Sequence, residues 1–357
     1  MDRWAGLAVF AVVLLLSVSG PSARAVDVYT DPVGFITLTI RGTNGAPPGT
    51  TSVLSYLGLG LTQLVVKQGR ITGAASNELV DALASWSDDQ YNGASGPHFI
   101  EITSGPYAGL VDDIVKTVGA TKKIYTANNL ASLGLANITN QTYRIRKHWT
   151  IASVFGPTNQ AGLQGGTSAA MADNVLVPDQ SGALVTYWYK TGGFPPGTGW
   201  RKGANASIDV ANDPIYFGDG VVVRRRVGPS VTVKLLGAVK LGRSILPLSQ
   251  GDTFMSNPFA ANLTLNTSGL YTTNVATGLK GGNSAGNADN VLLPTGPNGT
   301  LEIYWFKDSG FPPGTGWRKG ADAVTNVGTT PLGIAQGFVV RRKAPNAAFD
   351  WYTQPPY

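Results

Sequence analysis

Short runs of alternating apolar and polar residues dominate the chain and predict β-strands. The clearest is the run from Phe35 to Ile40, in which Ile and Leu alternate with Phe and Thr. Similar runs occur at 64–66, 99–102, 113–115, 124–125, 143–145, 231–241 and 245–248. Turn residues separate them at 44–45, 47–49, 92–93, 104–106 and 128–129. This spacing of short strands and tight turns predicts an all-β protein.

One segment predicts a helix instead. Residues 77–84 place Leu79, Val80 and Leu83 on one helical face, and Ser76 stands where an N-cap is expected. We therefore expect a short helix within the first β-rich region.

The second half of the chain contains an internal repeat. The 18 residues from Tyr187 to Ala204 recur from Tyr304 to Ala321, and the two copies differ at only three of these positions. Upstream, residues 172–178 recur as 288–294, and downstream, residues 220–226 recur as 337–343. The offset stays at 116 or 117 throughout, which indicates a duplicated unit.

Each copy predicts a β-hairpin with one buried face. Apolar runs at 175–177 and 184–189 flank turn residues 179–182, and residues 297–299 take the same place in the second copy. The strand face that carries Trp188, or Trp305 in the second copy, stays largely apolar and is expected to be buried. The opposite face exchanges Val185 for Glu302 and is expected to meet water. That face carries two tyrosines which we expect to be partly exposed, Tyr187 and Tyr304.

The first 25 residues have the pattern of a signal peptide. Arg3 gives a positive start, residues 7–18 are an uncharged apolar run, and Ala23-Arg24-Ala25 matches an A-x-A cleavage site. The apolar run is too short to span a membrane as a helix. We therefore expect export, cleavage before Val26, no transmembrane segment in the mature chain, and a location in the extracellular space, at the cell surface or in the periplasm.

These features together predict three β-units. We expect an all-β fold with a small N-terminal β-barrel or sandwich domain, followed by two homologous β-sandwich-like modules. The expected ranges are 1–25 for the signal peptide, 26–146 for the N-terminal domain, 147–228 for the first module, 229–343 for linker strands and the second module, and 344–357 for a Pro- and aromatic-rich tail.

Composition excludes several kinds of chemistry. The chain has no cysteine, which excludes disulfides, thiolate metal sites and cysteine nucleophiles. Its two histidines, His98 and His148, are isolated in sequence, so no metal site is recognisable and no cofactor is expected. A formal charge of +6 is modest: it favours acidic partners such as anionic glycans, and it argues against nucleic acid as a partner of an exported protein.

Three short motifs resemble a family of exported proteins of the verrucomicrobial type. They are Thr-Asp-Pro-Val-Gly-Phe at 30–35, Arg-Lys-His-Trp-Thr at 146–150 and the terminal segment from Trp351 to Pro-Pro-Tyr357. The resemblance extends over nearly the whole mature chain and implies neither an activity nor functional residues. Separately, Gly-Pro-Tyr-Ala-Gly at 105–109, with a following strand and residues 143–145, is similar to small β-modules of phage-tail and cell-surface proteins. Such modules imply a building or connecting role.

Patterns typical of catalysis are incomplete. Residues 282–286 match the G-x-S-x-G of a nucleophile elbow around Ser284, but no histidine follows in the chain. A glycine-rich loop is the better interpretation. The neighbouring carboxylates Asp112 and Asp113 would point to opposite faces of a strand, as would those at 88–89, so neither pair is expected to act on one bond.

Two further duplicated features have mainly structural interpretations. Asp173 and Asp289, each followed by Asn, could bind calcium, but the spacing of a calcium loop is missing and side-chain-capped turns are expected. Adjacent arginines end a strand in each copy, at 224–226 and 341–342. At least one per copy is expected to pack against a neighbouring layer or to pair with a carboxylate.

The best candidate for a ligand site is the repeated segment Phe-Pro-Pro-Gly-Thr-Gly-Trp-Arg-Lys at 194–202 and 311–319. A turn that presents an aromatic ring beside two cations suits stacking on a sugar and pairing with an anionic substituent. The competing interpretation is packing, in which Phe194 and Trp200 close the module and the cations are solvated. The candidate ligand-binding residues are Trp200, Arg201, Lys202, Trp317, Arg318, Lys319, Tyr187 and Tyr304.

We therefore expect a non-enzymatic structural or adhesion protein that binds neutral or anionic polysaccharide, with two copies of one loop giving avidity. Two alternatives stay open. One is a polysaccharide-processing enzyme with carboxylates from different strands, which requires a groove with two carboxyl groups about 5 to 9.5 Å apart. The other is a subunit that self-assembles into a surface layer or fibre.

Overall fold

The structure is a computed structural model that describes residues 31–357 except 45, 47–50, 93–95, 227 and 297–298. The predicted signal peptide at 1–25 lies outside the described residues, as do the expected turn at 47–49 and parts of those at 44–45, 92–93 and 297–299. Strands account for 42% and helices for 4%, so the predicted all-β class is confirmed. No helix in the described part of the chain is long and apolar enough to cross a membrane.

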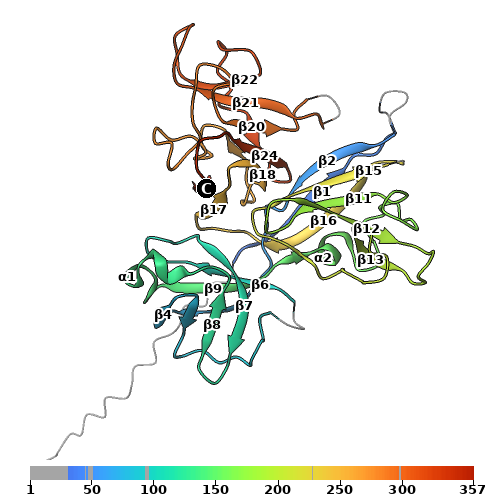
Figure 1. Cartoon of the computed structure of the whole chain (residues 1–357), viewed down its shortest axis with the longest axis vertical. Coiled ribbons are helices and arrows are strands. Elements are labelled where there is room, and N and C mark those ends of the chain that lie inside the picture. The colour runs from blue at the N-terminus through green and yellow to red at the C-terminus, as the bar shows by residue number, and fades with distance from the viewer. Residues whose placement is uncertain (1–30, 45, 47–50, 93–95, 227, 297–298) are drawn as a thin grey trace, which may run out of the picture. The chain divides into compact units, whose positions relative to one another are not determined.

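Residues 65–147 form a seven-stranded antiparallel sheet with its own hydrophobic core (Figure 1). In order across the sheet, the strands are β3 (Val65–Arg70), β9 (Thr142–Lys147), β6 (His98–Ile102), β7 (Val111–Val118), β8 (Lys123–Thr126), β5 (Glu78–Val80) and β4 (Gly73–Ala75). A 3₁₀ helix, η1 (Leu130–Leu133), and helix α1 (Leu135–Ile138) follow β8.

The prediction of a helix over 77–84 is wrong. Strand β5 lies in this segment and pairs with β4 and β8. Leu79 is buried in the core of the sheet, whereas Leu83 is 90% exposed. The apolar residues that would have shared a helical face are thus separated. Pairing on both edges gives the backbone more hydrogen bonds than an isolated helix of two turns, which is marginal in water.

The first five-stranded sheet is covered on one face by a two-stranded ribbon. The sheet strands are β13 (Gly199–Lys202), β12 (Leu184–Lys190), β11 (Asn174–Pro178), β15 (Gly220–Arg225) and β2 (Val53–Gly58). The ribbon is β1 (Val33–Ile40) with β16 (Val231–Ala238), and helix α2 (Ile151–Phe155) packs into the same core. Strands β10 (Trp149–Thr150) and β14 (Pro214–Ile215) form a short pair.

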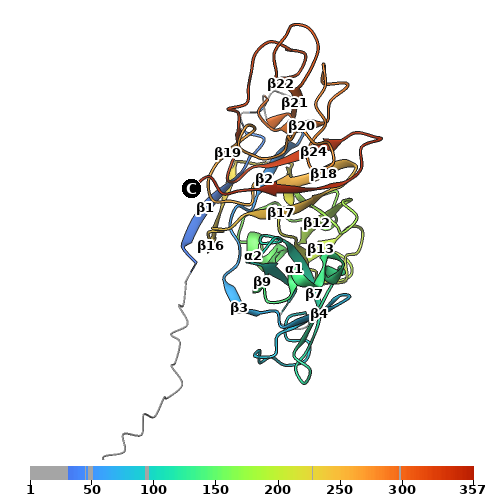
Figure 2. The same ribbon diagram turned by 90° about the vertical axis from the view of Figure 1, so that its left-hand side faces the viewer.

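The second five-stranded sheet has the same strand order (Figures 1 and 2). It consists of β22 (Gly316–Lys319), β21 (Glu302–Lys307), β20 (Asn290–Leu293), β24 (Gly337–Arg342) and β18 (Gly251–Ser256). Its ribbon is β17 (Ser244–Leu248) with β25 (Phe349–Thr353), and its short pair is β19 (Leu263–Thr264) with β23 (Pro331–Leu332). Residues from this sheet and its ribbon share a third core.

Strand pairing divides the chain differently from the expected ranges. Strands β1 and β2 fall within the expected N-terminal domain, 26–146, but pair with β16 and β15. We call the first five-stranded sheet and its ribbon the first sandwich, and the second sheet and its ribbon the second sandwich. The seven-stranded sheet is therefore inserted between strands of the first sandwich. In the expected tail, 344–357, residues 349–353 form β25 of the second sandwich.

Both faces of the repeated hairpin are buried at its tyrosines and tryptophans. Trp188 and Trp305, on the face predicted to be buried, are each 1% exposed, so that prediction holds there, whereas the predicted partial exposure of Tyr187 and Tyr304 is wrong. The two sandwich cores lie on the face that carries Tyr187 and Tyr304, which are only 5% and 3% exposed. Leu184, on the face expected to be buried, is 44% exposed. The exchange of Val185 for Glu302 was a misleading guide, since Glu302 stands at the beginning of β21 and pairs with Lys319 at 2.8 Å.

A buried cluster of charges connects the seven-stranded sheet to the first sandwich. Glu101 of β6 pairs with Lys240, which follows β16, and lies 3.5 Å from Nε of Arg146. Nη2 of Arg146 also pairs with Asp31, just before β1, at 2.6 Å. The side chains of all four are at most 7% exposed. Buried charges of this kind require their partners, because water cannot replace them.

Candidate functional site

The two tryptophans of the repeated segment are core residues. Trp200 is fully buried in the first sandwich and donates its indole N–H to the carbonyl of Gly156 at 2.8 Å. Trp317 is 1% exposed and packs edge-to-face against Phe306, with 5.7 Å between ring centroids. Both rings point into the sandwich because they alternate along β13 and β22 with residues of the other face. Neither indole presents a face on which a sugar could stack.

The two arginines of the repeated segment donate to backbone carbonyl groups on both sides of their own strands. Arg201 is 4% exposed, and its guanidinium donates to the carbonyls of Ala206, Trp200 and Thr198 at 2.9, 2.9 and 3.0 Å. Arg318 is 3% exposed and makes the equivalent bonds in the second copy. Since these donors are already used, neither arginine is placed to pair with an anionic ligand.

A buried lysine completes the support of each loop. The ammonium of Lys190 donates to the carbonyl of Pro195 and, at 3.1 Å, to that of Ala206. Lys307 makes the same two bonds in the second copy, to Pro312 and Ala323. Each ammonium ties the Pro-Pro-Gly turn to the segment that follows β13 or β22. The repeated cations therefore have a structural role that the sequence did not reveal.

The structure brings the remaining candidate residues together in pairs. Nζ of Lys202 lies 5.5 Å from the ring centroid of Tyr187 and 3.4 Å from a carboxylate oxygen of Asp213. Lys319 lies opposite Tyr304 across the strands and pairs with Glu302. The ammonium groups are half exposed but already face a carboxylate, so they form a surface ion pair in each copy.

The exposed aromatic residues of the repeated segment are Phe194 and Phe311, at 92% and 91%. The interpretation that Phe194 closes the module is therefore wrong. Each lies at the start of a turn whose later glycines have positive φ, 118° at Gly197 and 119° at Gly314. We call residues 194–198 and 311–315 the phenylalanine loops. The phenylalanines and the neighbouring tryptophans differ in how far they are buried, and the sequence of the segment does not show this difference. The phenylalanines were therefore not among the predicted ligand-binding residues.

The duplicated aspartates cap loops, as predicted. The carboxylate of Asp173 is fully buried and accepts from the backbone N–H of Gln164 and Arg226, each at 2.7 Å. It also pairs with Arg225 at 3.1 Å, and Asp289 pairs with Arg342 at 2.8 Å in the second copy. The expected partnership between a carboxylate and one of the adjacent arginines is thus confirmed.

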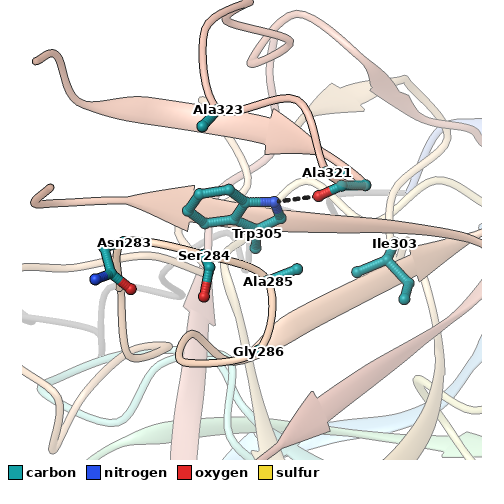
Figure 3. Close-up of a pocket in the computed structure, with 9 residues that line it drawn as sticks. Asn283, Ser284, Ala285, Gly286, Ile303, Trp305, Ala321 and Ala323 are labelled. Carbon is teal, nitrogen blue, oxygen red and sulfur yellow. Dashed lines mark hydrogen bonds between the residues drawn. The ribbon is translucent and has the colours of Figure 1, made fainter. Parts of the chain in front are cut away.

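Ser284 lies in a glycine-rich loop, as predicted. The loop lines a pocket of about 500 Å³ beside β21, together with Ile303, Trp305, Gly320, Ala321 and Ala323 (Figure 3). The carbonyl of Ser284 accepts from the N–H groups of Asn287 and Ala288, which forms a turn and not the start of a helix. The described residues that line this pocket include no charged side chain and no histidine, so none of them could serve as the base that activates a serine nucleophile.

A second pocket, of about 500 Å³, lies where segments of all three sheets meet. We call it the central pocket; its walls include Phe99, Asp113, His148, Tyr216, Asp219 and Phe254. Its carboxylates come from different strands and loops, which is the feature that the polysaccharide-processing alternative requires. That alternative stays a prediction. Among the described residues, no group of three or more histidine, aspartate and glutamate side chains could hold a metal ion.

The polar groups of the central pocket are incompletely paired. Nε2 of His148 lies 2.9 Å from Oδ1 of Asp113, while its buried Nδ1 has no hydrogen-bond partner in the described part of the chain. The carboxyl group of Asp219 makes no hydrogen bond or ion pair with any described residue. Burial, and then the nearby charge of Asp113, raise the pKa of Asp219 well above its ordinary range.

Comparisons with protein-family models, with curated proteins and with solved structures gave no match. The resemblance to exported verrucomicrobial-type proteins therefore stays a prediction.

Proposed function

We propose that this protein is exported and acts as a non-enzymatic adhesion protein that binds polysaccharide through its two phenylalanine loops. The observation that supports this most directly is that both copies of the repeat carry a phenylalanine at this position and that both rings, Phe194 and Phe311, are exposed. Packing or loop support accounts for the repeated tryptophan, arginine and buried lysine. It does not account for an aromatic ring that is over nine-tenths exposed in both copies.

The surroundings of the rings favour an uncharged ligand surface. Proline, glycine and threonine form the rest of each phenylalanine loop, and the nearby guanidinium groups are buried. Lys202 and Lys319 already face carboxylates. The apolar face of a neutral sugar ring therefore suits these loops better than the anionic glycans that the net charge suggested. Each contact alone is weak, and two loops on one chain raise the overall affinity by avidity.

The first prediction concerns the loops themselves. In the mature chain, Phe194→Ala and Phe311→Ala are each expected to weaken binding to an extended neutral polysaccharide by about tenfold or more, since each removes one of two linked contacts. Binding would be measured against neutral and anionic polysaccharides at low and high salt. Salt should have little effect, because the proposed contacts carry no net charge.

The matched control is Leu83→Ala, which removes an equally exposed apolar side chain from the seven-stranded sheet region. It should bind as the unaltered protein does. Binding that survives both loop substitutions would contradict the proposal. If the substitutions abolished concentration-dependent polymers, measured by light scattering, and left polysaccharide binding intact, the self-assembly alternative would replace it.

A separate prediction concerns export. The full chain, expressed in a bacterium with a general secretion system, is expected to yield a mature protein that begins at Val26. N-terminal sequencing or intact mass would identify the cleavage position. Replacing Ala23 and Ala25 with leucine should block cleavage, since these positions require small residues. Retention of uncleaved wild-type chain in the cytoplasm would contradict the proposed export.

A further inference from the structure

The central pocket contains acceptor groups that lack donors. Asp113 and Asp219 both line it, and burial and then the charge of Asp113 raise the pKa of Asp219. His148 is 3% exposed and hydrogen bonds to Asp113 through Nε2. In the neutral ring Nε2 then carries the hydrogen, so the unpartnered Nδ1 is an acceptor. The second oxygen of Asp113 and the carboxyl group of Asp219 can therefore accept hydrogen bonds that no described residue donates, and the buried Nδ1 is a third acceptor without a donor.

The walls of the central pocket are aromatic as well as acidic. The rings of Phe99 and Tyr216 contact the His148 imidazole, with centroids 4.8 and 5.3 Å away. Phe217 and Phe254 also line the pocket. Aromatic faces attract cations, and the attraction is stronger where water is partly excluded. The pocket thus combines negative charge, hydrogen-bond acceptors and ring faces in a volume suited to a small molecule.

The neighbouring charges do not neutralise this site. Lys240 approaches the ring of Phe217 at 5.6 Å but is buried against Glu101, so its charge is already paired. Asp112 accepts hydrogen bonds from Asn128, and Asp179 accepts them from Ser181 in its own turn. No lysine or arginine is among the described residues that line the pocket. The carboxyl groups of Asp113 and Asp219 therefore have no lysine or arginine partner in the described part of the chain.

We propose that the central pocket binds a small ligand through a protonated primary amine. An ammonium group supplies three N–H donors and one positive charge, which match the two carboxyl groups and the aromatic walls of the pocket. Its positive charge would favour the ionised form of Asp219. This site is separate from the phenylalanine loops, so loop variants leave it intact and pocket variants leave polysaccharide binding intact.

The test compares ligands that differ mainly in charge. Binding of glucosamine, glucose and n-butylamine to the mature protein would be measured by isothermal titration calorimetry at neutral pH. We expect glucosamine to bind at least about tenfold more tightly than glucose, in line with one charge-assisted contact. Binding of n-butylamine as well would show that the amine suffices, and binding of glucosamine alone would show that the ring contributes; both support the proposal.

Substitutions of Asp113 and Asp219 test whether these two residues bind the amine. Asp219→Asn and Asp113→Asn should each reduce glucosamine binding about tenfold or more, with little change of shape. The matched control is Asp89→Asn, which removes the same charge at an exposed turn where φ is 51°, a conformation that Asn tolerates. Equal binding of glucosamine and glucose, no binding of either amine at millimolar concentrations, or equal effects of Asp219→Asn and Asp89→Asn would each overturn the proposal.

Discussion

Trp317→Ala is expected to lower the free energy of unfolding by about 3–5 kcal/mol, the usual cost of removing a buried tryptophan side chain. The indole is 1% exposed and belongs to the core that includes Phe338 and Val340. Its removal leaves a cavity that rigid neighbouring strands cannot fill. Chemical denaturation followed by near-ultraviolet circular dichroism would measure the loss.

The control for this prediction lies six residues earlier. Phe311 belongs to the same repeated segment but is exposed, so Phe311→Ala should change the free energy of unfolding by no more than about 0.5 kcal/mol. The two substitutions separate the two roles in the segment: the tryptophan supports the fold and the phenylalanine is free to contact a ligand. A stable Trp317→Ala protein, or a Phe311→Ala protein destabilised to the same degree, would contradict this division.

Glu101→Gln is expected to cost about 3–5 kcal/mol, because it leaves Lys240 and Arg146 buried without their shared carboxylate. Gln has nearly the same shape, so the loss would come from charge and not from packing. The control is Asp252→Asn, which breaks the half-exposed pair with Arg341 and should cost at most about 1 kcal/mol. Equal effects of the two substitutions would show that the Glu101 cluster is not effectively buried.

The same cluster predicts a dependence on pH. Burial raises the pKa of Glu101, but the charges of Lys240 and Arg146 outweigh it and lower the pKa overall. A carboxyl group with a lowered pKa in the folded state stabilises the protein above its unfolded pKa, about 4.3 for Glu, and the contribution is lost as pH falls through the folded value. The difference between wild type and Glu101→Gln should therefore be largest near neutral pH and shrink in acid. A difference that grows on acidification would contradict this.

Local sequence patterns were sufficient for many of the strands, for the all-β class and for the capping aspartates, although they predicted a helix where β5 lies. They failed where distant segments decide the structure. Nothing near Phe35 to Ile40 indicates that this strand pairs with 231–238, since the pairing spans the inserted sheet. The hairpin face was misjudged because both faces are covered: one by the ribbon, the other by loops that bury Trp188 and Trp305 and accept their indole N–H groups.

The candidate site shows the same limit at the level of single side chains. Within Phe-Pro-Pro-Gly-Thr-Gly-Trp-Arg-Lys, the sequence offers two aromatic residues and two cations as possible ligand contacts. The alternation of side chains along the strand places Trp200 in the core, and Arg201 donates hydrogen bonds to nearby backbone carbonyl groups. These effects depend on where β13 begins and on how the loop closes, which local composition does not determine.

The most direct test of the central claim is polysaccharide binding by the double variant Phe194→Ala/Phe311→Ala, measured on a protein whose unfolding transition matches that of wild type. We predict that the variant folds normally and loses at least about 100-fold in affinity for the neutral polysaccharide that wild type binds, because both linked contacts are removed. Affinity equal to that of wild type, or no binding of any polysaccharide by the unaltered chain, would contradict the proposed adhesive role.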